Sequence, residues 1–293
     1  MELPPRRQPP TVRLRRLAAE LRALREEANL TPKLVKEQTE IDPATLYRIE
    51  SAKVRPQRRT VISLLSAYGA EPAKRDELLE LLKQSAEQGW LASYESELPE
   101  LLVHYMSFES EARSIRNYET ILIPGLLQTQ AYAYAAVTQA GLPIADEEDV
   151  ARRVEMRMQR QRLFERPDPL QLWAVIDESA LHRMVGGEEV MIEQLQRLID
   201  AGKAAHIVVQ VIPFSAGAHA GMPGSFAIIE FPDPQDSDIV YSDSMAGDLF
   251  LEADAEIRRF AAVFEHLRAA ALSPKDSARL ITERLRTLER GRT

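Results

Sequence analysis

The stretch NLTPKLVKEQTEIDPATLYRIESAKVRP, residues 29–56, contains two helix-start signals eleven residues apart. Thr31 and Asp42 are residue types preferred at helix N-caps, and a proline follows each of them at the first helical position, where proline is tolerated. Each signal opens a short helix, and a few residues remain between the two helices for a turn. These dimensions are typical of a helix-turn-helix.

Regular apolar spacing predicts further helices on both sides of this stretch. Leucines recur at three- and four-residue steps from Leu14 to Leu24, which is one face of a helix, and arginines lie between them. After Pro56, an apolar run continues with helical spacing until Gly69, a residue suited to end a helix. We expect these helices to close a shared core with the apolar residues of the central stretch, which are Leu34, Val35, Ile41, Leu46 and Ile49.

Residues 13–70 resemble the Xre-type, lambda repressor-like, helix-turn-helix family. The matching segments are Leu30-Thr31, Thr45-Leu46, Arg48-Ile49-Glu50 and Tyr68-Gly69, together with Val35, Ile41, Lys53, Pro56 and Leu64-Leu65. The resemblance implies a five-helix DNA-binding fold used as a dimer, and an ion pair between Arg25 and Glu50. Two positions depart from the family pattern: Glu40 stands at the turn where glycine is common, and Pro32 stands where glutamine is common.

In a helix-turn-helix, the N-terminal part of the second helix meets base edges in the major groove. We therefore predict that the bases are read by Pro43, Ala44, Thr45, Tyr47 and Arg48. Basic residues around that helix are expected to bind phosphates and set the register. These residues are Lys33, Lys36, Lys53, Arg55, Arg58 and Arg59.

The charge distribution agrees with this placement. The chain has 293 residues and a net charge of −8, but residues 1–60 contain 14 Lys and Arg against 8 Asp and Glu. The first sixty residues are therefore at +6 and the rest at −14, so only the first part is expected to approach phosphates. The absence of cysteine from the sequence excludes disulfides and thiolate metal sites. No apolar run is long enough for a membrane span, and MELPPRRQPP lacks the apolar core of a signal peptide, so we expect a cytoplasmic protein.

The remaining chain predicts a mixed α/β domain. After a helix-rich stretch that extends to about residue 166, strand-like runs cover 170–176, 207–212, 226–231 and 239–241, and helical runs cover 188–201, 253–271 and 273–289. The helix at 188–201 favours a parallel βαβ unit from the first two strands. The turn-rich PDPQDSD favours a hairpin from the last two.

Several sequence segments in this part resemble the C-terminal domain of actinomycete Xre regulators, the WhiJ-like group. They are SIRNYETILIPGLLQT (114–129), VIDESALHRMVGG (175–187), VQVIPFSAGAHAGMPGSFAIIEFPDP (209–234) and ALSPKDS (271–277). The resemblance implies a transcriptional regulator often encoded beside a small partner protein. It supplies no ligand and no catalytic residue.

The residues themselves indicate where a ligand would bind. Ligands gather at the carboxyl ends of strands in α/β folds, and we predict a pocket built from Glu178, His182, Arg183 and His219. The alternative is purely structural: Asp177 caps the next helix, Arg183 pairs locally, and His219 is a loop residue. The apolar segment 118–127 is either core or a partner surface. The basic run 152–166 is either a solvated helix face or a second nucleic-acid contact.

Taken together, the sequence predicts a mainly α five-helix domain followed by a mixed α/β domain. The predicted segments are a flexible basic and proline-rich tail (1–12), the helix-turn-helix domain (13–70), a helical connector (71–98) and a regulatory domain (99–293). We expect a homodimeric, sequence-specific regulator bound to double-stranded DNA, with a small-molecule or small-protein effector. The alternative is an antitoxin-like module that sequesters a small protein and regulates its own operon.

We expect no enzymatic activity, no cofactor and no metal. Ser215, His219 and Asp177 could be drawn as a catalytic triad, but the sequence has no nucleophile-elbow motif around Ser215. His182, His219 and Glu178 lack the close spacing that is typical of metal ligands.

Overall fold

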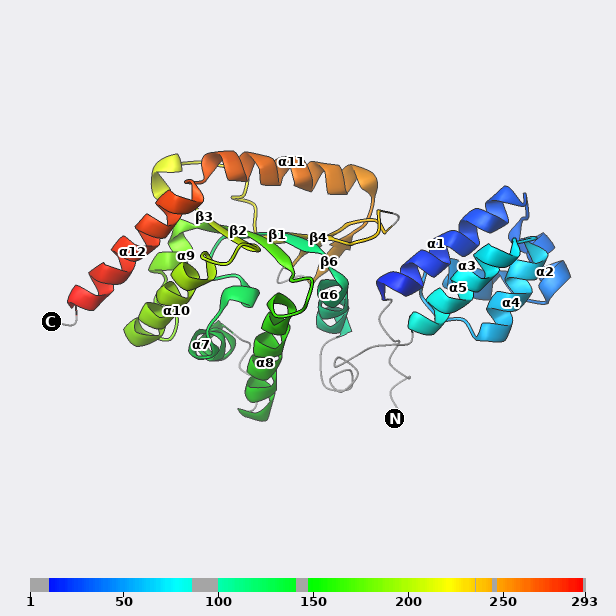
Figure 1. The fold of residues 1–293 in the computed structure, drawn as a ribbon, viewed down its shortest axis with the longest axis horizontal. Coiled ribbons are helices and arrows are strands. Elements are labelled where there is room, and N and C mark those ends of the chain that lie inside the picture. The colour runs from blue at the N-terminus through cyan, green and yellow to red at the C-terminus, as the bar shows by residue number, and fades with distance from the viewer. Residues whose placement is uncertain (1–10, 86–99, 141–146, 235, 244–246, 292–293) are drawn as a thin grey trace. The chain divides into compact units, whose positions relative to one another are not determined.

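The computed structural model describes residues 11–85, 100–140, 147–234, 236–243 and 247–291. Most of the predicted tail and the end of the predicted connector, residues 86–98, lie outside the described residues. The chain divides into two compact units, residues 1–111 and residues 112–293, and each is described by itself (Figure 1). No helix in the described ranges combines the length and the apolar character needed to span a bilayer.

The first unit is entirely helical in its described part. Its helices are α1 (Val12–Glu27), α2 (Pro32–Thr39), α3 (Pro43–Glu50), α4 (Arg58–Ala67), α5 (Pro72–Gln84) and α6 (Glu100–Glu111). The predicted caps fix the helix starts: the backbone N–H of Leu34 donates to Thr31 Oγ1 at 3.4 Å, and that of Ala44 donates to Asp42 Oδ2 at 3.0 Å. A third cap opens α1, where Leu14 N–H donates to Thr11 Oγ1 at 3.1 Å.

One core holds α1 to α5 together. Leu21, Val35, Leu64 and Leu78, from four of these helices, are fully buried in it, and each such side chain contributes about 1.5–3 kcal/mol by leaving water. Leu78 belongs to α5, so residues that the sequence assigned to a connector complete the helical bundle. Leu34 is 40% exposed, contrary to its predicted core position, because its neighbour Val35 occupies the buried side of α2.

The second unit contains a six-stranded sheet in the order β3-β2-β1-β4-β5-β6. The strands are β1 (Ser114–Glu119), β2 (Gln171–Asp177), β3 (Ile207–Ile212), β4 (Phe226–Glu230), β5 (Ile239–Ser242) and β6 (Leu249–Leu251). β1, β2 and β3 are parallel to one another. The parallel pairing of β2 with β3 confirms the predicted βαβ unit. β4 and β5 form the predicted antiparallel hairpin.

The central strand, β1, is not among the strands predicted from sequence. It pairs with β2 in parallel and with β4 antiparallel, within a stretch that we predicted to be helix-rich. Its sequence, SIRNYE, is mostly polar and lacks the apolar run of a buried strand. The short edge strand β6 was also missed.

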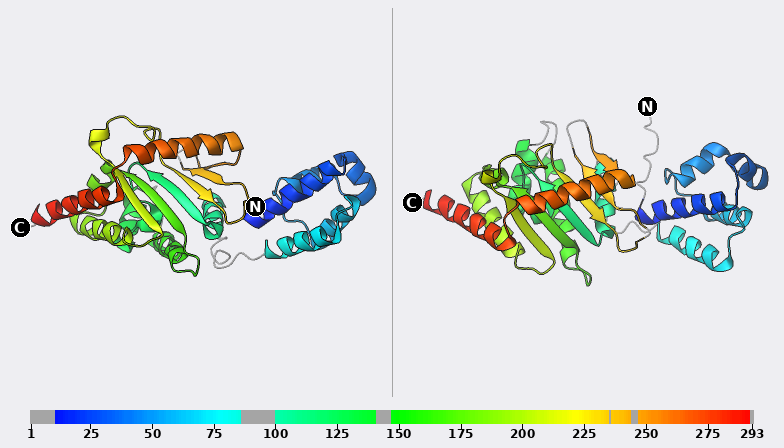
Figure 2. Two further views of the ribbon diagram at one scale, coloured as in Figure 1. Left: turned by 45° about the horizontal axis from the view of Figure 1, so that its top comes forward. Right: turned by 90° about the horizontal axis from the view of Figure 1, so that it is seen from above.

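Helices cover both faces of the sheet (Figures 1 and 2). One face is covered by α11 (Asp254–Ala270), whose Phe264 and Leu267 pack against Tyr118, Val175 and other apolar residues of the strands. The opposite face carries α7 (Gln130–Ala140), α8 (Glu147–Arg160) and α10 (Glu188–Ala201). The last helix, α12 (Pro274–Gly291), packs on α10 and beside the outer strand β3.

Three short helices follow the carboxyl ends of the parallel strands: η2 (Gly125–Leu127), α9 (Glu178–His182) and η4 (Phe214–Ala216). A fourth, η3 (Gln161–Phe164), lies between α8 and the start of β2. Because β1, β2 and β3 are parallel, Glu119, Asp177 and Ile212 end at one edge of the sheet. The loop 213–225 leaves β3 and enters β4 at this same edge.

Candidate functional site

The helix-turn-helix is formed by α2, a short turn and α3. Glu40 ends α2 in the left-handed region, with φ of 62°, which is the conformation that glycine would adopt without strain. Thr39 supports the turn: its hydroxyl donates to Val35 O at 2.7 Å and accepts from Ile41 N at 3.3 Å. The side chain of Thr39 thereby connects the last turn of α2 to the backbone of the turn that follows it.

The residues predicted to read bases lie along the outer side of α3. Tyr47 is 61% exposed, Ala44 and Arg48 are also exposed, and Pro43 and Thr45 are partly buried. Arg48 folds back toward the start of the helix, where Nη2 donates to Thr45 Oγ1 at 3.0 Å and Nε donates to Ala44 O at 3.3 Å. These contacts hold the guanidinium over the first turn of α3, the part of such a helix that meets base edges.

All six residues predicted to bind phosphate are exposed, namely Lys33, Lys36, Lys53, Arg55, Arg58 and Arg59. The ammonium of Lys53 lies 4.9 Å from the centre of the Tyr47 ring. Arg55 differs, because its Nη2 donates to Leu82 O at 2.8 Å and its Nε donates to Ser85 Oγ at 3.2 Å. Arg55 therefore braces the end of α5, a role that the charge pattern alone did not reveal.

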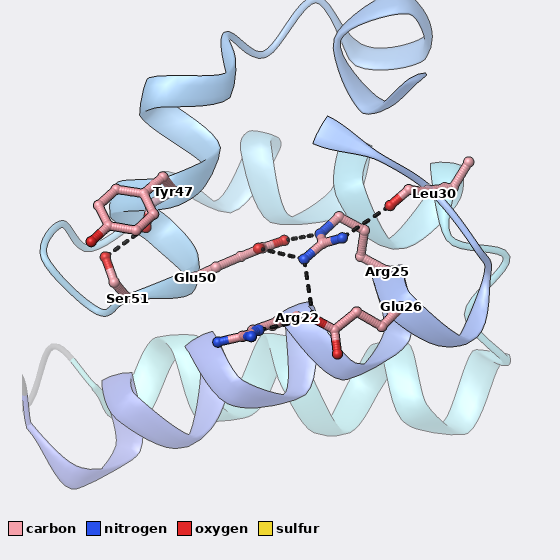
Figure 3. Close-up of polar contacts among 7 residues, drawn as sticks. All are labelled: Arg22, Arg25, Glu26, Leu30, Tyr47, Glu50 and Ser51. Atoms are coloured by element: carbon pink, nitrogen blue, oxygen red, sulfur yellow. Dashed lines mark hydrogen bonds and ion pairs between the residues drawn. The ribbon is translucent and has the colours of Figure 1, made fainter. Parts of the chain in front are cut away.

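Arg25 of α1 and Glu50 of α3 are joined by two hydrogen bonds (Figure 3). Arg25 Nε donates to Glu50 Oε1 at 2.7 Å and Nη2 donates to Oε2 at 3.1 Å, while Nη1 donates to Leu30 O at 2.9 Å. The side chains are only 12% and 10% exposed. Hydrogen bonding to Glu50, helped by its charge, raises the pKa of Arg25. The pair, with the bond to Leu30, links α1, the segment just before α2 and the last residue of α3.

In the second unit, the structure divides the predicted pocket residues into separate groups. Glu178 accepts from Phe214 N at 2.7 Å, and its other oxygen lies 3.3 Å from His182 Nε2. His182 also contacts the Phe214 ring, with 5.5 Å between the ring centres. These contacts anchor the start of loop 213–225. Arg183 is exposed at the end of α9.

His219 is held by Asp177 instead. Its Nδ1 accepts from Gly221 N at 3.2 Å, so Nε2 carries the proton and donates to Asp177 Oδ2 at 3.2 Å. Asp177 also caps α9 by accepting from Ser179 N at 2.9 Å, as the structural alternative predicted. Both ring nitrogens of His219 are thus occupied within the chain, and Ser215 is not among their partners. Of the three residues that could be drawn as a triad, His219 and Asp177 are joined and Ser215 is not bonded to either.

A polar centre that the sequence did not predict lies where β1 ends. Glu119 accepts from Asn117 Nδ2 at 3.3 Å and from the hydroxyl of Ser225. Burial raises the pKa of Glu119 from 4.5 to about 7, against the opposing effect of these hydrogen bonds. Sequence reasoning missed Glu119 because β1 was not recognised as a strand, and its position just before an apolar run was the only local signal.

Two further residues bind the segment that follows β1. Arg157, on α8, donates from Nη1 to Gln128 Oε1 at 2.7 Å, and burial lowers its pKa to about 10. The hydroxyl of Tyr132, on α7, accepts from Ile123 N at 3.2 Å, and burial raises its pKa. Arg157 belongs to the basic run that we predicted to be either a solvated face or a nucleic-acid contact. Its side chain instead contacts Gln128 within the second unit. In the described ranges, no group of three or more His, Asp or Glu residues is arranged to hold a metal.

Comparison with known families gives one match in each half of the chain. Residues 16–78 match a model described as a helix-turn-helix domain, and residues 102–283 match a model described as a domain of unknown function, DUF5753. No curated protein and no solved structure matched the chain. The helix-turn-helix domain indicates DNA binding. Because the second match covers more than half of the sequence, the chain belongs to the DUF5753 family, here with a helix-turn-helix domain at its N-terminal side.

Proposed function

We propose that the protein is a sequence-specific transcriptional regulator of the Xre type, related to the WhiJ-like group of actinomycetes and acting in the cytoplasm. The observation that carries this proposal is the outer surface of α3. There Tyr47 and Arg48 stand exposed, and Lys53 lies against the Tyr47 ring. The adjoining helix α2 adds the exposed Lys33 and Lys36, so the same motif offers groups that read bases and groups that bind phosphates.

We further propose that the protein acts as a homodimer whose C-terminal domain receives a signal. Two copies of α3 would then meet two half-sites of a near-palindromic operator. A ligand or a small protein that favours one arrangement of the two helix-turn-helix domains shifts the population of dimers. The shift is toward or away from the arrangement that fits both half-sites. The chain after residue 60 has a net charge of −14 and is repelled by phosphates, so the basic N-terminal domain is the part that binds DNA.

The test is a gel-shift titration with the upstream region of the protein's own gene. Thr45→Ala and Arg48→Ala should each weaken specific binding by about 1–3 kcal/mol if these side chains read bases. Arg258→Ala, which removes an exposed arginine of α11, is the matched control and should not change affinity. Affinity should also fall steeply with salt. Unchanged affinity and site preference in both α3 variants would refute the assignment.

A second candidate, an antitoxin-like role, is favoured by exposed apolar side chains at the carboxyl edge of the sheet. Ile121, Met184, Phe214 and Met222 are 50%, 43%, 59% and 68% exposed, and they come from the segments that follow β1, β2 and β3. Exposed apolar groups gathered on one side are typical of protein-binding surfaces. This role predicts a stable complex with the product of a small neighbouring gene, lost in Phe214→Ser and Met222→Ser and detected by size-exclusion chromatography of the co-expressed pair.

A further inference from the structure

The side chain of Arg48 is tied to the helix that carries it. Its Nη2 donates to Thr45 Oγ1 at 3.0 Å and its Nε donates to Ala44 O at 3.3 Å, and both acceptors lie one turn earlier in α3. Residues three and four apart share one face of a helix, and side chains lean toward the helix N-terminus. The guanidinium is therefore held over the first turn of α3, although Arg48 itself is exposed.

These two bonds engage one edge of the guanidinium and leave another edge available. The group is planar, and its five N–H donors point in fixed directions. Nε and Nη2 form the side edge, and each gives one N–H to an acceptor within α3. The end edge consists of Nη1 and the second N–H of Nη2, and it has no acceptor in the part of the chain that the structure describes. Two parallel donors therefore remain for an external molecule.

The positive charge of Arg48 is also left for an external partner. Its two acceptors, a hydroxyl and a carbonyl oxygen, are both neutral. The carboxylates at the two ends of α3 have other cations. Asp42 lies 3.5 Å from Lys36 Nζ, and Glu50 is held by Arg25 at 2.7 Å. No carboxylate among the described residues pairs with Arg48, so an acceptor on another molecule would meet no competing anion.

Guanine is the base that fits two parallel donors. In the major groove its N7 and O6 are adjacent acceptors, whereas adenine offers one acceptor beside a donor, thymine one acceptor beside a methyl group, and cytosine a donor. Only guanine can therefore accept both hydrogen bonds of the end edge of Arg48. A phosphate also offers two oxygens, but the first turn of a recognition helix meets base edges rather than the DNA backbone.

The other residues predicted to read bases do not offer the same contact. Pro43 and Ala44 have apolar side chains. Tyr47 has a single hydroxyl, which accepts from Lys53 Nζ at 3.3 Å, and the same ammonium lies 4.9 Å from the centre of its ring. Of the five predicted base-reading residues, Arg48 alone carries two parallel N–H donors. A bidentate contact with a base is therefore expected from this residue.

We propose that Arg48 reads one guanine through Nη1 and Nη2, which donate to N7 and O6, and that Thr45 is the positioning residue of this contact. Thr45 then acts on DNA through Arg48 and does not itself read a base. Holding the guanidinium before DNA arrives reduces the side-chain freedom that binding removes, which strengthens the contact. The inference rests on the proposed function, because it needs α3 in the major groove, and it names one base that α3 recognises.

The experiment measures base preference with the full-length protein. A pool of random duplexes is bound at low ionic strength, the retained sequences are determined, and one retained duplex is then varied at each position in turn. For each bound α3 we expect one position at which guanine gives about 10- to 100-fold tighter binding than the other three bases, the range that a bidentate contact supplies.

Replacing that guanine by 7-deazaguanine tests one of the two acceptor atoms. The analogue still pairs with cytosine and keeps O6, but it has a carbon in place of N7. The wild type should bind the substituted duplex about 10-fold more weakly, whereas Arg48→Ala should bind both duplexes equally because the contact is already absent. Arg48→Lys keeps the charge without the planar pair of donors and should lose most of the preference for guanine.

Variants of Thr45 test the positioning role. Thr45→Val keeps the branched shape without the hydroxyl and should reduce the preference for guanine about 3- to 10-fold, whereas Thr45→Ser keeps the hydroxyl and should retain it. Arg58→Ala is the matched control, since it removes an exposed arginine that we predict to bind phosphate. It should weaken all duplexes by the same factor and leave the preference for guanine unchanged. Circular dichroism checks the fold of each variant.

Three results would overturn the reading of guanine by Arg48: equal binding of guanine and 7-deazaguanine by the wild type, a preference for guanine that survives in Arg48→Ala, or a loss in Arg48→Ala that is the same for every duplex. The last of these would make Arg48 a phosphate-binding residue. Equal preferences in Thr45→Val and Thr45→Ser would remove the positioning role of Thr45. A protein that retains no duplex at low ionic strength overturns the proposed function as well, whereas one that binds its site and fails these tests loses only this inference.

Discussion

Replacing Arg25 by methionine should strongly destabilise the helix-turn-helix domain. The change removes the guanidinium and keeps an unbranched apolar side chain, so Glu50 is left without a cation while only 10% exposed. Breaking a buried pair by removing one partner costs about 3–5 kcal/mol. Because both side chains retain about a tenth of their surface in contact with water, we expect the lower end, roughly 3 kcal/mol. For a domain of this size that corresponds to a melting temperature lower by roughly 12–24 °C.

Companion variants separate the ion pair from its surroundings. Glu50→Gln keeps an acceptor for Arg25 and should cost less than Arg25→Met. The double variant Arg25→Met/Glu50→Leu should cost less than the sum of its single variants, because no buried charge is left alone. Arg22→Met is the matched control on the same helix: Arg22 pairs with Glu26 at 2.9 Å, but both side chains are more than half exposed, so protection should hardly change.

The assay is hydrogen exchange of the full-length protein, read by mass spectrometry on peptides from α1 to α4. Protection there reports the free energy of opening of this unit apart from the second one. Thermal unfolding gives an independent measurement. If Arg25→Met loses no more protection than Arg22→Met, or if the double variant equals the sum of the single ones, then the pair does not brace α1 against α3.

Three further predictions concern single positions. Glu119→Gln should remove a pH dependence: a carboxyl group whose pKa is raised by folding stabilises the folded state below its ordinary pKa, and that contribution, at most about 3 kcal/mol, is lost as pH rises from 4.5 to about 7. Without ligand, the wild type should therefore melt lower at about pH 8 than at about pH 5, whereas Glu119→Gln should change less, and parallel curves would contradict the burial of this group. Glu40→Gly should stabilise the first unit by roughly 0.5–1 kcal/mol in chemical denaturation, because glycine adopts φ of 62° without strain, and an equal gain from Glu40→Ala would contradict this cause. Gly221→Ala should destabilise the second unit by about 1–3 kcal/mol, since a β-carbon there would lie 2.3 Å from the buried Tyr118 ring, and thermal unfolding at the wild-type temperature would show that the ring can move aside.

Much of the fold was predictable because the corresponding signals are local. The N-cap and proline pairs Thr31-Pro32 and Asp42-Pro43 predict helix starts at the positions where α2 and α3 begin. The apolar runs at 207–212 and 226–231 gave β3 and β4 almost to the residue, and the acidic helical pattern at 188–201 gave α10. β1 was missed because its residues are polar, and only its two neighbouring strands give it a reason to be extended.

The predicted sites follow the same division. Side chains on one helix, such as Tyr47 and Arg48, could be placed from their spacing, because a helix fixes the direction of each residue along it. Arg55 could not, since its partners lie about thirty residues away on α5. His219 was predicted at the carboxyl edge, but its pairing with Asp177 rather than with Glu178 depends on how the loop 213–225 returns to β4.

By itself, therefore, the sequence determined where helices start and stop, which part of the chain carries positive charge, and where the helix-turn-helix lies. These properties depend on neighbours three or four residues apart and on composition. Only the tertiary structure decided that a polar segment becomes the central strand and that Glu119, at its end, meets Ser225 of a distant loop. The reason is physical: strand pairing and the burial of charge join residues that are far apart along the chain, and no local pattern records which of them will meet.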